Sequence, residues 1–279
     1  MKTPKKAPTP SRPAQTKATR SPRGDRPARG DRPARDERPA AKAPQDAGRL
    51  AWHPAPVPAS PERNGAPRRA KPTQEFHPDV VGELLYEALE TELGGVEIYK
   101  TALRCARNAD LKKEWKKYLK QTETHVETMQ KVCAKFGLDV DALTAGREIV
   151  KHIGSSLVQA MNMALETGNA GVAERVAAEC VTFAETKDHT NWSLIGQIVK
   201  HSSGENADTL KWAHEKCEDE EDEHLYHSRG WARELWIEAL GMPAVLPPPE
   251  EVRHVKSAVA AAKAAAHRED EIEKSATAG

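Results

Sequence analysis

Acidic and imidazole side chains interrupt four stretches of this sequence in which apolar residues recur at helical spacing. Glu221 and His224 are three residues apart, a spacing that places two side chains next to each other on one face of a helix. Glu92 and His125 each fall within an apolar series of their own, and a fourth stretch carries an acid and a histidine one turn apart. The candidate metal ligands are therefore Glu92, His125, Glu185, His189, Glu221 and His224.

A carboxylate in an apolar core costs several kcal/mol unless it is paired or bound to a metal. Taken alone, Glu92 is as compatible with a solvent-facing position, and His125 is best explained as a hydrogen-bonded core histidine. Four such stretches together require either mutual ion pairs or shared cations. Oxygen and imidazole donors suit iron, manganese or zinc, and the scattered cysteines argue against a thiolate site. We expect one or two ions of iron or manganese, with zinc less favoured.

The segments that carry these residues are predicted to be helices because no proline interrupts the chain between Pro78 and Met242 and the apolar spacing is helical throughout. Glycines are expected to close three of them. Short links make neighbouring helices antiparallel, and the middle helix is long enough to cross from one hairpin to the other. The fold class is therefore all-α, a four-helix bundle with an additional crossover helix; a five-helix bundle of another kind is the alternative. The predicted helices span about 79–107, 110–137, 145–168, 171–201 and 205–241.

Each predicted helix has an apolar face. On the third helix, this face is assigned to a series at four-residue spacing, which consists of Ile149, Ile153, Leu157, Met161 and Leu165. Tyr99 and Tyr118 are each expected about 10 Å along the bundle axis from the metal position, where core packing is favoured over a role as a hydrogen-bonding or electron-transfer group near the metal.

The two ends of the chain differ in composition from the middle. Residues 1–75 carry 18 Lys and Arg against 7 Asp and Glu, whereas residues 76–247 carry 19 against 29. Proline recurs throughout the first segment, including an imperfect repeat at 23–39, so a disordered basic arm is expected. Such an arm could contact nucleic acid or acidic surfaces, although a solubilising tail is the favoured reading. The predicted domains are the arm 1–75, the bundle 76–246 and a tail 247–279.

The tail begins with three prolines that stop the preceding helix, and its alanine-rich part, about 250–273, has good helix propensity. The sequence leaves open whether this part docks on the bundle, binds a partner or is only a nascent helix. No run of eighteen apolar residues is present, so no membrane span is expected. The four dispersed cysteines and the absence of a secretory signal pattern favour a cytoplasmic protein.

Four segments resemble the ligand-bearing helices of the ferritin-like superfamily, which includes ferritins, bacterioferritins, rubrerythrins and manganese catalases. They read EALETELGGVEIYKTAL at 87–103, YLKQTETHVETM at 118–129, AECVTFAETKDHTNW at 178–192 and EEDEHLYH at 220–227. The resemblance covers about 165 residues and has the segments in the family's order. It implies a ferritin-like bundle with metal ligands at Glu92, His125, Glu185 (or, failing that, Glu179), Glu221 and His224.

The second of these segments departs from the family pattern. The family has Glu-x-x-His there, but Thr122 stands three residues before His125, and the nearby glutamates at 123 and 127 point away from its face. A bridging carboxylate is then missing unless His189 or Asp188 substitutes for it. A mononuclear site, an asymmetric pair and a degenerate structural site all stay open.

Two functions compete on these grounds. The first is a metal-dependent redox protein that acts on metal ions and small oxidants, by iron oxidation or by peroxide or dioxygen reduction, as in bacterial ferritin-like stress proteins. The second is a non-enzymatic bundle whose basic arm binds nucleic acid or an acidic partner, with metal absent or structural. We also expect a homo-oligomer; a cage-forming store is a further alternative.

Overall fold

The computed structural model describes residues 76–268, 270, 272 and 273, and its regular elements are all helices. All five predicted helices are present, and every helix end lies within two residues of its predicted position. The predicted basic arm lies outside the described residues. Among those residues, no helix has the length and apolarity needed to cross a membrane. The helices are α1 (Pro78–Cys105), α2 (Ala109–Lys135), α3 (Ala145–Glu166), α4 (Ala170–His201), α5 (Glu205–Ala239), α6 (Pro249–Val252) and α7 (Ala258–Ala266).

Local chemistry explains where the helices begin and end. The side chains of Asn108 and Asn169 accept hydrogen bonds from the first backbone N–H groups of α2 and α4, as residues at a helix N-terminus commonly do. Gly137, Gly168 and Gly241 follow α2, α3 and α5 with φ of 68°, 69° and 78°. Glycine adopts this left-handed conformation without steric cost, so the prediction that glycines close these helices is confirmed.

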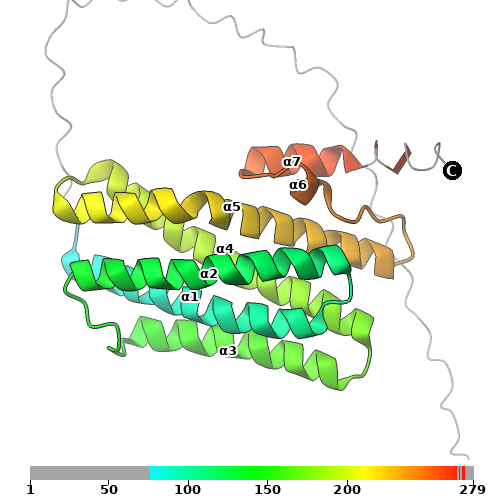
Figure 1. Cartoon of the computed structure of the whole chain (residues 1–279), viewed down its shortest axis with the longest axis horizontal. Coiled ribbons are helices and arrows are strands. Elements are labelled where there is room, and N and C mark those ends of the chain that lie inside the picture. The colour runs from blue at the N-terminus through cyan, green and yellow to red at the C-terminus, as the bar shows by residue number, and fades with distance from the viewer. Residues whose placement is uncertain (1–75, 269, 271, 274–279) are drawn as a thin grey trace, which may run out of the picture. The chain divides into compact units, whose positions relative to one another are not determined.

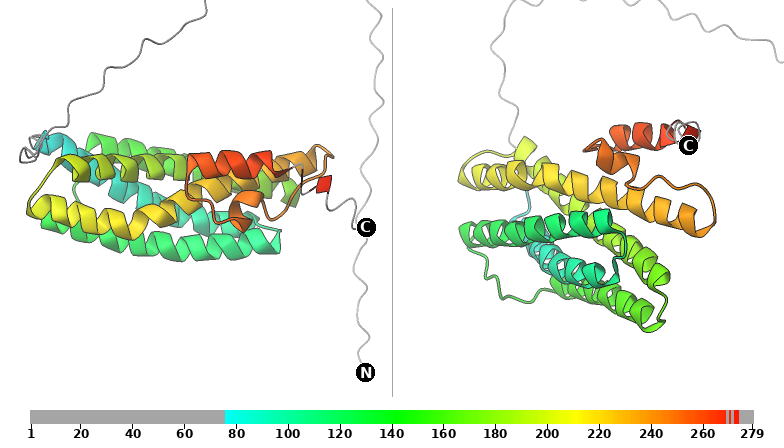
Figure 2. Two further views of the ribbon diagram at one scale, coloured as in Figure 1. Left: turned by 90° about the horizontal axis from the view of Figure 1, so that it is seen from above. Right: turned by 45° about the vertical axis from the view of Figure 1, so that its right-hand side comes forward.

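Four long helices form the bundle, and α3 lies along its outside (Figures 1 and 2). α1 packs against α2 and α4, and α5 packs against α4 and α2, while α3 packs against α1 and α4. The links between α1 and α2 and between α4 and α5 are short, so each of these pairs is an antiparallel hairpin. α3 occupies the connection from one hairpin to the other.

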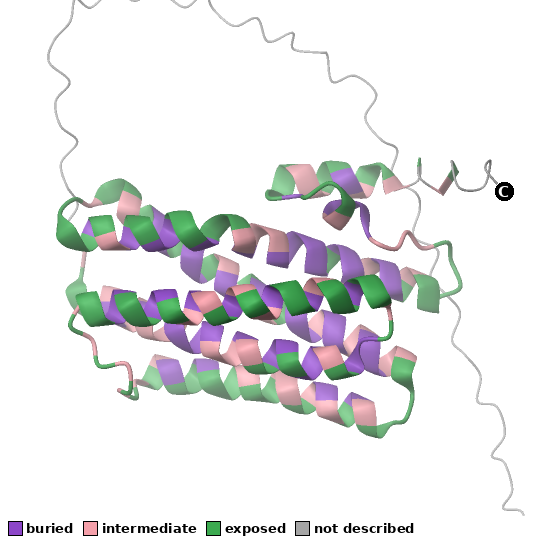
Figure 3. Cartoon of the chain, in the orientation of Figure 1, coloured by how far each residue is buried: buried purple, intermediate pink, exposed green. Residues whose placement is uncertain are grey.

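The apolar face predicted for α3 is wrong at its N-terminal end. Ile149 and Ile153 are 60% and 54% exposed, whereas Val150 and Met161 are buried. Residues four apart on a helix are offset by about 40°, so a series at four-residue spacing winds around the helix and leaves the packed side. The exposed outer side of α3 is visible in Figure 3.

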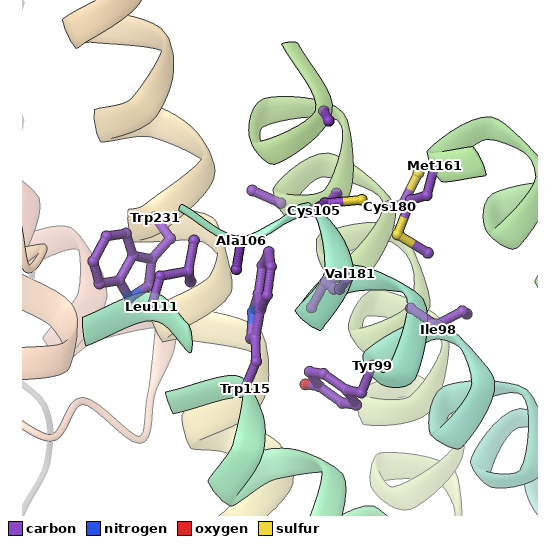
Figure 4. Packing of buried hydrophobic residues seen from close by; sticks show 14 of the residues in the cluster. Ile98, Tyr99, Cys105, Ala106, Leu111, Trp115, Met161, Cys180, Val181 and Trp231 are labelled. Carbon is purple, nitrogen blue, oxygen red and sulfur yellow. The ribbon is translucent and has the colours of Figure 1, made fainter. Parts of the chain in front are cut away.

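The bundle core consists of two apolar clusters, one towards each end. One contains Trp115, Tyr99 and Trp231 and is shown in Figure 4. The other contains Leu85, Met129 and Trp192. Between them, at mid-height, the buried side chains are polar or charged, so the four long helices enclose a polar layer between two apolar ones.

The C-terminal segment is docked on α5 as two short helices, where the sequence suggested one helical stretch (Figure 1). The guanidinium of Arg233 on α5 makes two hydrogen bonds to the buried Glu250 of α6, at 2.6 and 2.9 Å. Gly230 makes room for this contact, because a Cβ there would lie 2.7 Å from Glu250 Oε2. Of the three possibilities that the sequence left open for this segment, the structure shows docking on the bundle.

Candidate metal centre

The polar layer brings together five of the six predicted ligands from four helices. Glu92 comes from α1, His125 from α2, Glu185 from α4, and both Glu221 and His224 from α5; none is more than 4% exposed. Their donor atoms form two groups of three, within each of which all atoms lie within 4.8 Å of one another. The first group is Glu92, His125 and Glu221, and the second is Glu185, Glu221 and His224.

Glu221 belongs to both groups and lies between the two histidines. Its Oε1 is 2.6 Å from Nδ1 of His125 and 3.5 Å from Nδ1 of His224. The same Nδ1 atoms are 3.7 Å from Oε2 of Glu92 and 3.6 Å from Oε2 of Glu185. Each group therefore contains one imidazole, one carboxylate of its own and the shared Glu221.

Both imidazoles present Nδ1 to the layer because Nε2 is held from outside. Nε2 of His125 lies 2.8 Å from Oε2 of Glu220, and Nε2 of His224 lies 3.1 Å from Oε1 of Gln121. Histidine ligands in metal sites almost always donate their second N–H to such an acceptor, which fixes the tautomer and the ring orientation. In both rings Nδ1 is therefore the nitrogen that faces the carboxylates of the layer.

One oxygen of each outer carboxylate is also held from outside. Trp192 Nε1 donates to Glu92 Oε1 at 2.9 Å, and the hydroxyl of Tyr99 donates to Glu185 Oε1 at 2.7 Å. The second oxygen of each, Oε2, faces the layer without a hydrogen-bond partner. Tyr99 is thus both a buried core residue and a hydrogen-bond donor to a candidate ligand, the second of which the sequence left as the less favoured alternative.

Buried polar atoms without hydrogen bonds are rare in folded proteins, and each one calls for a physical explanation. In the described part of the chain, nine buried side-chain nitrogen and oxygen atoms lack a hydrogen-bond partner, and seven of the nine belong to this layer. The seven are Glu92 Oε2, His125 Nδ1, Glu185 Oε2, Asp188 Oδ1, both carboxylate oxygens of Glu221, and His224 Nδ1.

The layer holds more buried acid than it can ionise without cations. Burial, and then the charges of Asp188 and Glu221, raise the pKa of Glu92 well above its ordinary value of 4.5. Burial and then Glu185 do the same to the pKa of Glu221. A carboxylic acid with a raised pKa holds its proton in place of a missing positive charge.

The two histidines respond differently to the same surroundings. Burial lowers the pKa of His224. Burial also acts to lower the pKa of His125, but hydrogen bonds to Cys217 and Glu220 outweigh it and raise that pKa to about 9. At His224 the hydrogen bond with Glu185 raises the pKa but does not outweigh burial. The outer partners contribute to the difference, because a carboxylate stabilises an imidazolium more than the neutral amide of Gln121 does.

His189 is the predicted residue that the structure does not bring into the layer. Its Nε2 lies 2.9 Å from Asp222 Oδ1, and its side chain is 31% exposed. The preceding residue, Asp188, points inward instead and is 5% exposed. Glu179, the reserve candidate, accepts a hydrogen bond from Trp236 Nε1 at an exposed position. The signal for Asp188 was its spacing, three residues after Glu185.

The donor set fits a hard or borderline divalent cation. Carboxylate oxygens and imidazole nitrogens are typical ligands of iron, manganese and zinc. All four cysteines are free and buried, and none belongs to the two donor groups.

Comparison of the chain with protein-family models, with curated proteins and with solved structures gave no match.

Proposed function

We propose that this protein is a ferritin-like metalloprotein that binds two iron or manganese ions in the polar layer of its bundle. The observation that carries the proposal is the pair of donor groups that share Glu221, together with the buried donor atoms in them that have no hydrogen-bond partner. Polar side chains buried without a common ligand would not be expected to direct their unpaired donor atoms, from four different helices, into the same polar layer.

The topology supports the ferritin-like part of the proposal. Ferritin-like dinuclear sites take a Glu from each of two helices and a Glu-x-x-His pair from each of the other two. Here α1 supplies Glu92, α4 supplies Glu185, and α5 supplies Glu221 and His224 as such a pair. α2 supplies His125 with Thr122 in the place of the carboxylate.

Each ion would have its own carboxylate and imidazole. Glu92 and His125 would hold one, Glu185 and His224 the other, and both oxygens of Glu221 are available to be shared. Trp192 and Tyr99 fix the two outer carboxylates and leave one oxygen of each free, so we expect each to bind through that single oxygen. The surrounding apolar clusters keep bulk water out of the layer.

Bound iron or manganese supplies one-electron redox chemistry, and we propose a small oxidant, dioxygen or a peroxide, as the reaction partner. The protein's own part is to hold several negative charges in a dry interior, which favours the more highly charged metal ions. A cytoplasmic location and a homo-oligomeric state belong to the same proposal.

Metal analysis tests this function directly. The full chain, stripped with a chelator and titrated with Fe²⁺ without oxygen or with Mn²⁺, should take up two ions per chain and melt at a higher temperature. The double substitution Glu92→Ala with His224→Ala removes one ligand from each group and should abolish the uptake. A wild-type chain that retains its helical circular dichroism but takes up no ion contradicts the proposal.

A further inference from the structure

Thr122 leaves the α2 side of the layer without a carboxylate. Its hydroxyl donates a hydrogen bond to the backbone oxygen of Tyr118 at 3.0 Å, so it is not directed at the donor groups. Its methyl group packs against α1, where a Cβ added to Gly95 would lie 3.1 Å from it. The side chain is satisfied and tightly packed, and it offers no ligand atom.

Asp188 on α4 lies at the height of Glu221 on α5. Glu185 and His224 are in contact across these antiparallel helices, with 3.6 Å between Oε2 and Nδ1. Asp188 is three residues after Glu185, and Glu221 is three residues before His224. In antiparallel helices these steps move both positions by about 4.5 Å in the same direction. Asp188 therefore faces the layer opposite the shared glutamate.

The side chain of Asp188 is close to the charged groups of the layer itself. It is 5% exposed, its Oδ1 has no hydrogen-bond partner, and the charge of His125 and a hydrogen bond with Glu92 act to lower its pKa. The neighbouring His189 turns away and pairs with Asp222. Burial, with the charges of Glu221 and Glu185, raises the pKa of Asp188 well above its ordinary value. A buried carboxylate in this position needs either a proton or a cation.

We infer that Asp188 is a metal ligand and supplies, from α4, the second carboxylate between the two ions that α2 lacks. This inference rests on the proposed function, since it assigns one more residue to the same centre. The charge that a glutamate at position 122 would contribute is thus retained in the layer but comes from the opposite side of the bundle. The centre then contains four carboxylates, Glu92, Glu185, Asp188 and Glu221, and two imidazoles.

The test compares two carboxylates in neighbouring positions. Metal-free full-length protein is titrated with Mn²⁺ alone, bound ions are counted by elemental analysis after desalting, and affinities are taken from the titration. Asp188→Asn keeps the size of the side chain but removes its charge, and it should weaken the second ion about tenfold or more, so that one ion remains after desalting. The matched control Asp222→Asn removes a carboxylate that faces His189 and should keep two ions.

A compensating double variant distinguishes the loss of a metal ligand from a merely structural effect of the substitution. The double variant Asp188→Asn with Thr122→Glu returns the carboxylate to α2, and it should recover the second ion. Metal-free Asp188→Asn should also melt at a higher temperature than the metal-free wild type, because one buried acid has been removed. Two ions bound to Asp188→Asn with wild-type affinity overturn the inference and leave the proposed function standing. A wild type that takes up no Mn²⁺ overturns both.

Discussion

α2 and α5 each place a histidine in the polar layer in the same way, but the residues around the two histidines differ. On each helix a fully buried histidine directs Nδ1 into the polar layer and has its Nε2 held by a residue of the other helix. They differ three residues earlier, where α5 has Glu221 and α2 has Thr122. They also differ in the outer partner, which is the carboxylate of Glu220 for the α2 histidine and a neutral amide for the α5 histidine.

This difference makes the two halves of the layer unequal. His125 has an anionic outer partner, and hydrogen bonds to Cys217 and Glu220 raise the pKa of His125 to about 9 in spite of burial. The hydrogen bond with His125 lowers the pKa of Glu220 to about 2. An anionic outer partner makes an imidazole a stronger donor to a metal. We therefore expect the ion held by Glu92 and His125 to bind more tightly than the ion held by Glu185 and His224.

The largest effect is expected from Glu221→Gln, because Glu221 is the one residue common to both donor groups. Loss of an outer partner alone commonly costs ten- to a hundredfold in metal affinity, so loss of the shared ligand should weaken both ions by more than about a hundredfold. Mn²⁺ titration measures this. Glu218→Gln, at a side chain 50% exposed on the same helix, is the control and should bind like the wild type. Two ions at wild-type affinity in Glu221→Gln would show that the layer is not the site.

The metal-free protein should lose stability as the pH rises from 6.5 to 9. The pKa values of Glu92, Asp188 and Glu221 are raised in the folded chain, chiefly by burial, so the folded state holds protons that the unfolded state has released. Stability from such groups is complete below their ordinary pKa and is lost as the pH rises through the raised values. His125, with a pKa of about 9, acts in the same direction, and the opposing shift of His224 acts below 6.5.

Melting temperatures measured with a chelator across this range test the sign. Saturating Mn²⁺ is the control, because bound cations stabilise the ionised carboxylates and should flatten the trend or reverse it. A metal-free melting temperature that rises between pH 6.5 and 9 would mean that the buried acids are compensated in some other way.

Exchanging the outer partners should reduce the inequality between the two halves. Glu220→Gln gives His125 a neutral partner like that of His224, and we expect the tighter ion to lose about tenfold in affinity. Gln121→Glu makes the converse change at His224 and should strengthen the weaker ion. Resolved stepwise Mn²⁺ binding isotherms give both constants. Equal losses at the two steps in Glu220→Gln would contradict the assignment of Glu220 to one half.

The sequence predicted the helices and most of the layer because both depend on local patterns. Helix ends follow from glycines and capping residues, and Glu221 with His224 is visible as a spacing. Asp188 and His189 could not be separated in this way. Adjacent residues lie about 100° apart on a helix, so an error of one position in the helix phase exchanges the residue that faces inward with the one that faces out.

Contacts between residues far apart in the chain could not be predicted from local sequence patterns. The tyrosine at position 99 was predicted to pack in the core, and its ring does, but its hydroxyl reaches Glu185, 86 residues further on. The docking of α6 depends on Arg233 meeting Glu250 across a turn of the chain that no local pattern specifies. Such pairs depend on how whole helices are placed, whereas spacing reports only on one helix at a time.

The smallest effect is expected from Thr122→Val, which separates the two roles that position 122 could have. Valine keeps the shape that packs against Gly95 and removes the hydroxyl, whose only hydrogen bond is to a carbonyl oxygen of its own helix. We expect two Mn²⁺ ions at wild-type affinities and a change in unfolding free energy within about 1 kcal/mol. Loss of an ion in this variant would make the threonine hydroxyl a ligand and would remove the difference between α2 and α5 on which the asymmetry of the layer depends.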